Sequence, residues 1–356
     1  MFLKKKFFID IQKPILQSRE EDMKRKIRHI LIELIMSMLL LAVSGCGKAD
    51  AVIKPEEKET KKQLEWVETE EGAQIFYGEK TESAYRITQL PFPTFWGGEA
   101  YSILTPQGDL YLVDGGFQGE DGERIAQYIE ENGGKVKGWI LTHPHVDHIG
   151  AFLDYATLHP DKVENVYYSP FTREFFEKEE DPEIYQILNK AILFYEFLEV
   201  QEATADKIEY IPMKVGDILM LEQLKLECFA SFDFARKDVN GNSLVFTLSY
   251  EDFTLLLTGD MTEATLESIR SLAKPDAAIW NTDVIQIPHH GYAGGITTQA
   301  LYTETGARLA LLDCTKEEFE NNSAQIHQTV QLLEGLEIPF FTRFLGEGGN
   351  VIYLYE

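Results

Sequence analysis

Residues 143–148 read His-Pro-His-Val-Asp-His, and the rest of the chain is organised around this stretch. The apolar run at residues 138–142 directly before it predicts a buried strand. Residues 149–158 follow with a helical pattern. We therefore expect four ligand-type side chains on a short loop between a strand and a helix, where two rigid elements can direct them to one place.

The spacing of these side chains predicts two metal ions rather than one. His143 and His145 lie two residues apart and can face one side of an extended turn, whereas Asp147 and His148 are adjacent and can face a second point. Imidazole suits zinc, and a carboxylate suits a harder ion. Two ions about 3.5–4 Å apart can activate water and stabilise both ends of a displacement. Such a density of ligands, in a chain with only eight histidines, argues against a loop that binds nothing.

Length and charge limit the classes of function. The 356 residues are enough for one large α/β domain or two smaller ones. A net charge of −26 disfavours tight nucleic-acid binding, because phosphates are contacted mainly by Lys and Arg. It does not exclude a nuclease whose metal ions meet the phosphate directly.

The N-terminal residues predict export. A basic segment at residues 24–28 precedes an apolar run at 30–43, which is short for a membrane span and suits a signal peptide. Small residues then precede Cys46, and this arrangement resembles a bacterial lipobox, whose cysteine is acylated. The resemblance implies a signal peptide over residues 1–45 and a lipid anchor on the outer face of the bacterial cell membrane; an uncleaved N-terminal anchor is the alternative. Met23 is a more ordinary start for such a signal, which would leave residues 1–22 untranslated.

Residues 46–69, rich in Lys and Glu, predict a flexible tether, and residues 70–356 then form the folded domain. Apart from Cys46, only Cys228 and Cys314 remain. Two thiols do not make a disulfide framework, and both lie in apolar, strand-like runs. We expect them to be buried and unreactive.

The remaining pattern predicts two halves, each with strand hairpins followed by strand–helix alternation. The predicted helices cover residues 123–132, 181–206, 263–272, 298–303 and 324–336. The predicted strands cover residues 74–77, 85–90, 101–106, 110–114, 215–220, 224–229, 244–249, 253–257, 284–287, 309–312, 340–342 and 351–354. This order favours an α/β fold of two sheets packed face to face, with helices outside each sheet.

Three strand ends carry ligand-type residues: the loop at 143–148, Asp260 after the strand at 253–257, and His289 with His290 after the strand at 284–287. Together they resemble the signature of the metallo-β-lactamase superfamily, with matching order from about residue 84 to 356. The resemblance implies a four-layer αββα sandwich with a two-metal site at the edge of the sheets.

Carried over position by position, the resemblance implies six metal ligands: His143, His145, Asp147, His148, Asp260 and His289. The first two would bind one metal ion, Asp147 and His148 the second, and Asp260 would bridge the ions. His289 would complete the second site, with His290 as the alternative. Asp114 matches an early Asp that supports the ligand loop by hydrogen bonds.

The catalytic candidates are Asp147, which would orient the attacking group, and His290 or His327, which would protonate the leaving group if water does not. The chain departs from the family pattern in one respect. Many members have another metal His before the bridging Asp, but here the only His in that interval is His159.

Asn240 or Asn242 lies near the place where that ligand is expected. We therefore expect two zinc ions, or one if the first site stays empty. Manganese is the alternative metal, because an oxygen donor favours a harder ion.

Within the superfamily the nearest resemblance is to the hydrolase domain of ComEC-type competence proteins, carried by residues 240–245, 255–260 and 288–291. Exported phosphorylcholine esterases are related hydrolases. The resemblance implies a surface-anchored phosphodiesterase that acts on DNA or on phosphorylated cell-wall polymers. The alternatives are an acyl hydrolase of the lactonase or β-lactamase type and a non-catalytic surface-binding lipoprotein, because fold alone does not select a substrate.

Overall fold

The computed structural model describes residues 64–91, 98–177, 191–292, 298–321 and 324–355. The predicted signal peptide and Cys46 lie outside the described residues. Within the described ranges, no helix combines the length and the apolar character needed to cross a membrane.

The first sheet has nine strands, and its β5 to β8 run parallel to one another. The C-terminal strand β16 lies between β2 and β3, parallel to β2 and antiparallel to β3. In order across the sheet the strands are β1 (Glu65–Thr69), β2 (Gly72–Tyr77), β16 (Asn350–Tyr355), β3 (Ala84–Gln89), β4 (Ala100–Leu104), β5 (Leu110–Asp114), β6 (Val136–Leu141), β7 (Val163–Tyr168) and β8 (Glu209–Pro212).

The second sheet has seven strands, of which the last four along the chain run parallel. In order across the sheet they are β15 (Phe340–Thr342), β14 (Leu309–Leu312), β13 (Val284–Gln286), β12 (Phe253–Leu257), β11 (Val245–Tyr250), β10 (Leu224–Ala230) and β9 (Ile218–Leu221). Parallel strands of this kind are buried on both faces, which explains their continuous apolar sequence.

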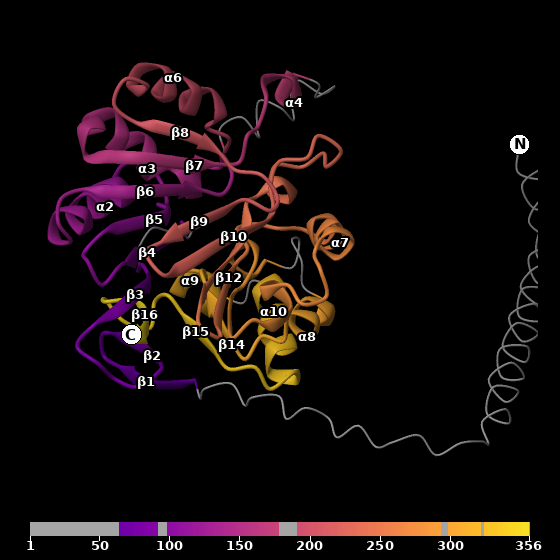
Figure 1. Ribbon diagram of the computed structural model, residues 1–356. Coiled ribbons are helices and arrows are strands. Elements are labelled where there is room, and N and C mark those ends of the chain that lie inside the picture. Colours follow the sequence, from indigo (N-terminus) through magenta and orange to yellow (C-terminus); the bar gives the residue numbers. More distant parts are fainter. Residues whose placement is uncertain (1–63, 92–97, 178–190, 293–297, 322–323, 356) are drawn as a thin grey trace, which may run out of the picture. The chain divides into compact units, whose positions relative to one another are not determined.

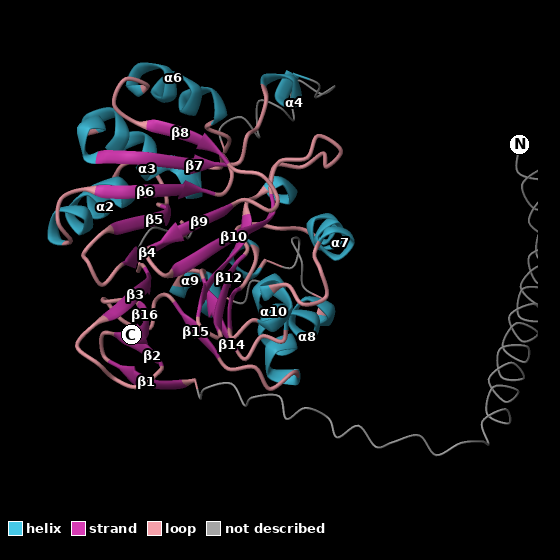
Figure 2. Cartoon of the chain, in the orientation of Figure 1, coloured by secondary structure: helices cyan, strands magenta, loops and turns pink. Residues whose placement is uncertain are grey.

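Alternating side chains of each sheet point into two different cores. In β5, Tyr111 and Val113 pack between the two sheets, whereas Leu110 and Leu112 pack under the helices of the first sheet. In β12, Leu256 likewise packs under the helices of the second sheet. The molecule therefore has two outer helical layers and two inner sheets (Figures 1 and 2), which confirms the predicted αββα sandwich.

Helices α2, α3 and α6 cover the first sheet, and α7, α8 and α10 cover the second. Short α4 and α9 and four 3-10 turns complete the helical elements of the described chain. Their bounds are α2 (Glu120–Glu131), α3 (Val146–Leu158), η1 (Pro160–Lys162), α4 (Arg173–Glu177), α6 (Phe194–Thr204), η2 (Asn240–Asn242), α7 (Glu263–Leu272), η3 (Ala278–Asn281), η4 (His289–Gly291), α8 (Gln299–Thr305), α9 (Lys316–Glu320) and α10 (Ala324–Gly335).

Helix α3 begins at Val146, three residues earlier than predicted, so Asp147 and His148 lie in its first turn rather than on a loop. An acidic side chain in the first turn interacts favourably with the positive end of the helix dipole, which helps the helix to start there. These two predicted metal ligands are therefore held by a helix, which fixes their directions more firmly than a loop would.

In the described part of the helix predicted over residues 181–206, α6 begins at Phe194 and ends at Thr204. Residues 178–190 lie outside the described part of the chain. Residues 191–193 are not helical because their backbone bonds to the ligand stretch: Val146 N donates to Ala191 O (2.9 Å) and Leu193 N donates to Pro144 O (2.7 Å). This segment braces the metal-ligand loop.

The predicted tether at residues 46–69 is wrong at its C-terminal end. Residues 65–69 form β1, which pairs antiparallel with β2 at the edge of the first sheet. Strands β7 and β8 were also not predicted; they extend the parallel part of that sheet.

Candidate metal centre

The predicted ligands meet where strands of both sheets end. Asp114 is the last residue of β5, the 143–148 stretch follows β6, and Asp260 follows β12. His289 and His290 follow β13. In open parallel sheets the carboxyl ends of the strands are the usual place for a ligand site. Here the two sheets bring their strand ends to a common edge around Asp260.

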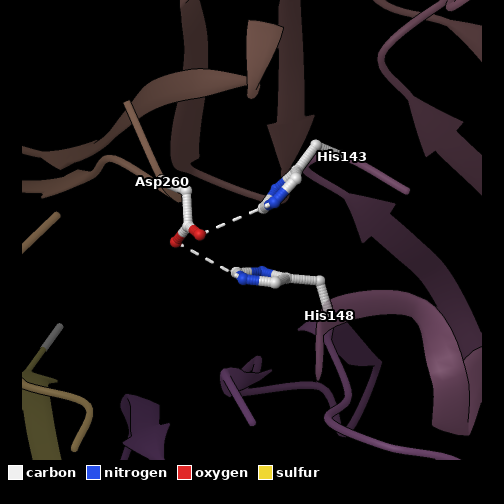
Figure 3. Close-up of side chains that lie close together, drawn as sticks. All are labelled: His143, His148 and Asp260. Atoms are coloured by element: carbon white, nitrogen blue, oxygen red, sulfur yellow. Dashed lines mark ion pairs between the residues drawn. The ribbon is translucent and has the colours of Figure 1, made fainter. Parts of the chain in front are cut away.

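The carboxylate of Asp260 is buried, and its two oxygens face different histidines. Oδ1 lies 3.4 Å from Nε2 of His148 and 3.7 Å from Nε2 of His290. Oδ2 lies 3.7 Å from Nε2 of His143 and 3.6 Å from Nε2 of His289. Figure 3 shows His143 and His148 approaching this carboxylate from separate elements. Asp260 therefore stands between two groups of donors.

The remaining two predicted ligands join these groups. Nδ1 of His145 lies 3.0 Å from Nε2 of His143. Oδ2 of Asp147 lies 3.3 Å from Nε2 of His290 and 4.0 Å from Nε2 of His148. The first group consists of His143, His145, His289 and Asp260 Oδ2, and the second group consists of Asp147, His148, His290 and Asp260 Oδ1.

The spacing of the donors fits metal ions. Two donors at 2.0–2.1 Å from one tetrahedral zinc ion are about 3.3–3.4 Å apart. The donor atoms of Asp147, His148 and His290, and those of His143, His148 and Asp260, converge closely enough to hold a metal ion. In the second group, His148 Nε2, His290 Nε2 and Asp260 Oδ1 are buried with no hydrogen-bond partner among the residues that the structure describes. Buried polar atoms are rarely left without a partner, so atoms converging in this way fit a bound cation.

Hydrogen bonds outside the cluster fix the ring orientations. His148 Nδ1 donates to Asp114 Oδ2 (2.7 Å), and His290 Nδ1 donates to the backbone oxygen of Asp313 (3.1 Å). A ring that carries its proton on Nδ1 presents the lone pair of Nε2 to the cluster, as a metal ligand must. Asp114 also accepts from Thr142 N (2.8 Å) and Thr142 Oγ1 (2.6 Å). Asp114 thus supports the ligand loop, as the sequence predicts.

The electrostatics of the cluster favour a cation. Burial lowers the pKa of His143 well below its usual value, so this ring is neutral and able to bind a metal ion. Burial also acts to lower the pKa of His148, but Asp260, Asp114 and Asp147 outweigh it and raise that pKa well above its usual value. Three carboxylates therefore create a negative potential at His148, which a bound cation would satisfy.

Comparison with known proteins agrees with this architecture. The family model of the metallo-β-lactamase superfamily matches residues 94–298, more than half of the chain. The chain belongs to the metallo-β-lactamase superfamily. With the His/Asp cluster, this membership identifies the chain as a metal-dependent hydrolase.

Two individual proteins are similar. Hydroxyacylglutathione hydrolase from Hahella chejuensis is 34% identical over 74 residues, a match that covers 21% of this chain and 27% of that protein. The matched part thus spans about a quarter of that relative's length. The crystal structure of the metallo-β-lactamase fold protein YhfI from Bacillus subtilis has 13% identity and a TM-score of 0.46, covering 76% of this chain and 99% of that one.

In this member of the superfamily, the structure places His290 rather than His289 in the second group. His290 is 3% exposed and lies against Asp147, whereas His289 lies beside Asn240 at the first group. The two adjacent residues have φ of +51° and +53°, and their ring centroids are 6.2 Å apart. The expectation that His289 completes the second site is therefore not what the geometry favours.

His327, the other candidate proton donor, lies on α10 and is half-buried. Within the described ranges, no hydrogen bond or ion pair connects its side chain to the Asp260 cluster. Helix α10 packs against the η4 turn that carries His289 and His290, and a catalytic role for His327 stays a prediction.

Sequence reasoning missed two buried residues that hold the Asp260 turn. Gln286 Oε1 accepts from Thr258 N (2.7 Å) and Gly259 N (3.0 Å), and its Nε2 donates to Glu99. Burial raises the pKa of Glu99 well above its usual value. The only signal in the sequence was an amide side chain within the apolar strand at residues 284–287.

A small apolar cavity of about 80 Å³ lies beside the first group. His143 contributes to its wall, together with aromatic side chains of the β7–α4 connection and of α6, among them Phe171, Phe194 and Phe197. His143 therefore borders an apolar cavity.

Proposed function

We propose that this hydrolase is a two-metal phosphodiesterase. The proposal is carried by the position of the Asp260 carboxylate, whose two oxygens face two separate groups of donors. Asp260 and the two groups of donors would hold two metal ions, which would supply the water activation and charge stabilisation that phosphodiester hydrolysis needs. Zinc fits the imidazoles, and manganese is the alternative.

The residues around the ions have separate tasks in this reaction. Bound divalent ions lower the pKa of water and polarise the phosphoryl oxygen. Asp147 is the carboxylate of the cluster that reaches solvent, with a side chain 22% exposed against 2% for Asp260. Asp147 would therefore orient the proton of an attacking water, and Asp260 would hold the ions.

The substrate proposed is DNA or a phosphorylated cell-wall polymer. The net charge of −26 supports short or small phosphodiesters over long DNA, because a long phosphate backbone would be repelled. The lipobox-like sequence at Cys46 supports a location on the outer face of the cell membrane, where cell-wall polymers are found. The lipid anchor can be tested by fractionating cells that express a Cys46→Ala variant, which has no cysteine to acylate. If this variant is found in the membrane fraction with its signal sequence cleaved off, the protein does not need the lipid to stay there, and the lipid anchor is contradicted.

A second candidate is acyl hydrolysis. Two observations favour it: the 74-residue similarity to hydroxyacylglutathione hydrolase, and the apolar cavity beside His143, which suits an acyl chain better than a phosphate. The metal centre would polarise the carbonyl of a thioester, a lactone or a β-lactam in the same way.

A substrate panel separates the two candidates. The protein, loaded with zinc or manganese, is assayed with bis-p-nitrophenyl phosphate, S-lactoylglutathione, a lactone and a β-lactam. We expect the phosphodiester to be cleaved, and Asp260→Asn to lower kcat by at least about 100-fold without unfolding the protein. Asp217→Asn, an exposed turn carboxylate, is the matched control. Cleavage of the acyl compounds alone would refute the phosphodiesterase proposal.

A further inference from the structure

We propose that His289 is the third histidine of the first metal site and replaces the ligand that this chain lacks between His148 and Asp260. The inference rests on the metal centre of the proposed function but not on its substrate. It changes the role expected for His289, which the family resemblance assigns to the second site. It also gives each of the two adjacent histidines its own metal ion.

The first step is to exclude one of the two asparagines that could stand in for the absent histidine. Asn242 is fully buried and its amide is occupied by the backbone: Oδ1 accepts from Asp233 N (2.7 Å), and Nδ2 donates to Arg236 O (3.1 Å) and Asp238 O (3.0 Å). Asn242 therefore shapes its own loop and has no donor atom left for a metal ion.

Asn240, by contrast, faces His289. Its Nδ2 lies 3.2 Å from Nε2 of His289. Its Oδ1 is buried, with no hydrogen-bond partner among the described residues. Turning the amide over would bring Oδ1 to the place of Nδ2, where a carbonyl oxygen could join His289 in binding an ion. His289 thus lies where the missing ligand is expected.

The contacts of His289 lie on the first-site side of the bridging carboxylate. Its Nε2 is 3.6 Å from Asp260 Oδ2, the same oxygen that lies 3.7 Å from His143 Nε2. Asp147, the carboxylate of the second site, forms ion pairs with His148 and His290. In the described part of the chain, Asp147 forms no ion pair with His289.

The backbone explains how neighbouring residues serve different ions. Both histidines adopt left-handed φ values, +51° and +53°, which non-glycine residues seldom adopt unless the surroundings impose them. The turn is fixed by His289 N donating to Gly259 O (3.2 Å) and by Tyr292 N donating to His289 O (2.8 Å). The two ring centroids are 6.2 Å apart, and the two Nε2 atoms lie near different oxygens of Asp260.

The assignment can be tested by counting metal ions rather than by activity. The full chain in detergent is equilibrated with buffered zinc at a concentration that saturates the wild type, and zinc per chain is measured. The single variants are His145→Gln, His289→Gln and His290→Gln. His159→Gln is the matched control, because His159 is exposed and its ring contacts that of Tyr155. Circular dichroism confirms that each variant is folded.

We expect two ions in the wild type and the control, and one in each of His145→Gln and His289→Gln. The double variant His145→Gln/His289→Gln should still hold one ion, because both changes empty the same site. The double variant His289→Gln/His290→Gln should hold none, because it empties both.

Three results would overturn the inference. Two ions in His289→Gln would show that His289 is not a ligand. If His145→Gln/His289→Gln holds no zinc ion and His289→Gln/His290→Gln holds one, His289 is a ligand of the second site. Fewer than two ions in the saturated wild type would refute the two-metal centre of the proposed function as well, and this separates the failure of the centre from the failure of the assignment.

Discussion

Replacing Asp114 by Asn should weaken metal binding without removing a ligand. The carboxylate accepts three hydrogen bonds: from His148 Nδ1 at 2.7 Å, from Thr142 Oγ1 at 2.6 Å and from Thr142 N at 2.8 Å. An amide keeps the shape of the side chain, but its nitrogen cannot accept a hydrogen bond. One side of the group must therefore lose its partner, and His148 loses the charge that orients it.

The size of the effect follows from these contacts. A hydrogen bond to a charged group contributes about 1.5–3 kcal/mol, and each 1.4 kcal/mol corresponds to about a tenfold change in affinity. The loss of one such bond should therefore weaken zinc binding at the second group about 10–100-fold, the range typical of residues that orient a metal ligand. The first group, which Asp114 does not contact, should change less.

The assay is a zinc titration against a competing chelator, with wild type, Asp114→Asn and Asp217→Asn compared at one pH. Asp217 is an exposed carboxylate that accepts from Lys214 N at 2.8 Å, so the control also loses a carboxylate–backbone contact but lies away from the metal centre. A zinc affinity within twofold of wild type for the folded Asp114→Asn protein would refute the reasoning that Asp114 positions His148.

Two further predictions concern stability and the thiols. Gly150→Ala should lower the free energy of unfolding, measured in urea, by about 1–3 kcal/mol, because the added Cβ would lie 2.4 Å from Gln118 N. Gly335→Ala, which has open space at its Cβ, should not destabilise the protein. Equal effects of the two changes would contradict this packing argument. Burial raises the pKa of Cys228 and of Cys314 to about 12, so a thiol reagent at pH 8 should label neither until the protein unfolds. Stability should fall as the pH rises from about 9 to 12, because the thiols of the unfolded chain ionise first. Labelling of Cys228 or Cys314 in the native protein at pH 8, located by peptide mapping, would show that these thiols are accessible.

Local patterns predicted the elements that carry the site. The apolar run before His143 and the helix after it were both found, because strand and helix periodicity are local properties of the sequence. The convergence of Asp260 with that loop followed from the positions of strand ends. The start of α3 was misplaced because ligand-rich residues carry little periodicity, so the first helical turn was hidden in the motif.

Other parts of the site could not be predicted, because they depend on contacts between distant residues. The choice between His289 and His290 is made by two left-handed backbone conformations, which no spacing rule reveals for non-glycine residues. Gln286 and Glu99 meet across 187 positions of sequence, so neither could be recognised as a support of the Asp260 turn. The non-helical segment at residues 191–193 is likewise imposed by hydrogen bonds to the ligand loop.

The position of β16 has a consequence for the order of folding. The β1–β2 hairpin is connected to the rest of the first sheet only through β16, and Ala73 bonds to Asn350 across 277 positions. During synthesis this hairpin has no place in the sheet until the C-terminal strand is available, whereas β3 to β6 can pair with one another much earlier. Pairings between residues so far apart form slowly. Closure of the first sheet should therefore be a late step, and until it occurs the edge of β3 stays exposed to aggregation.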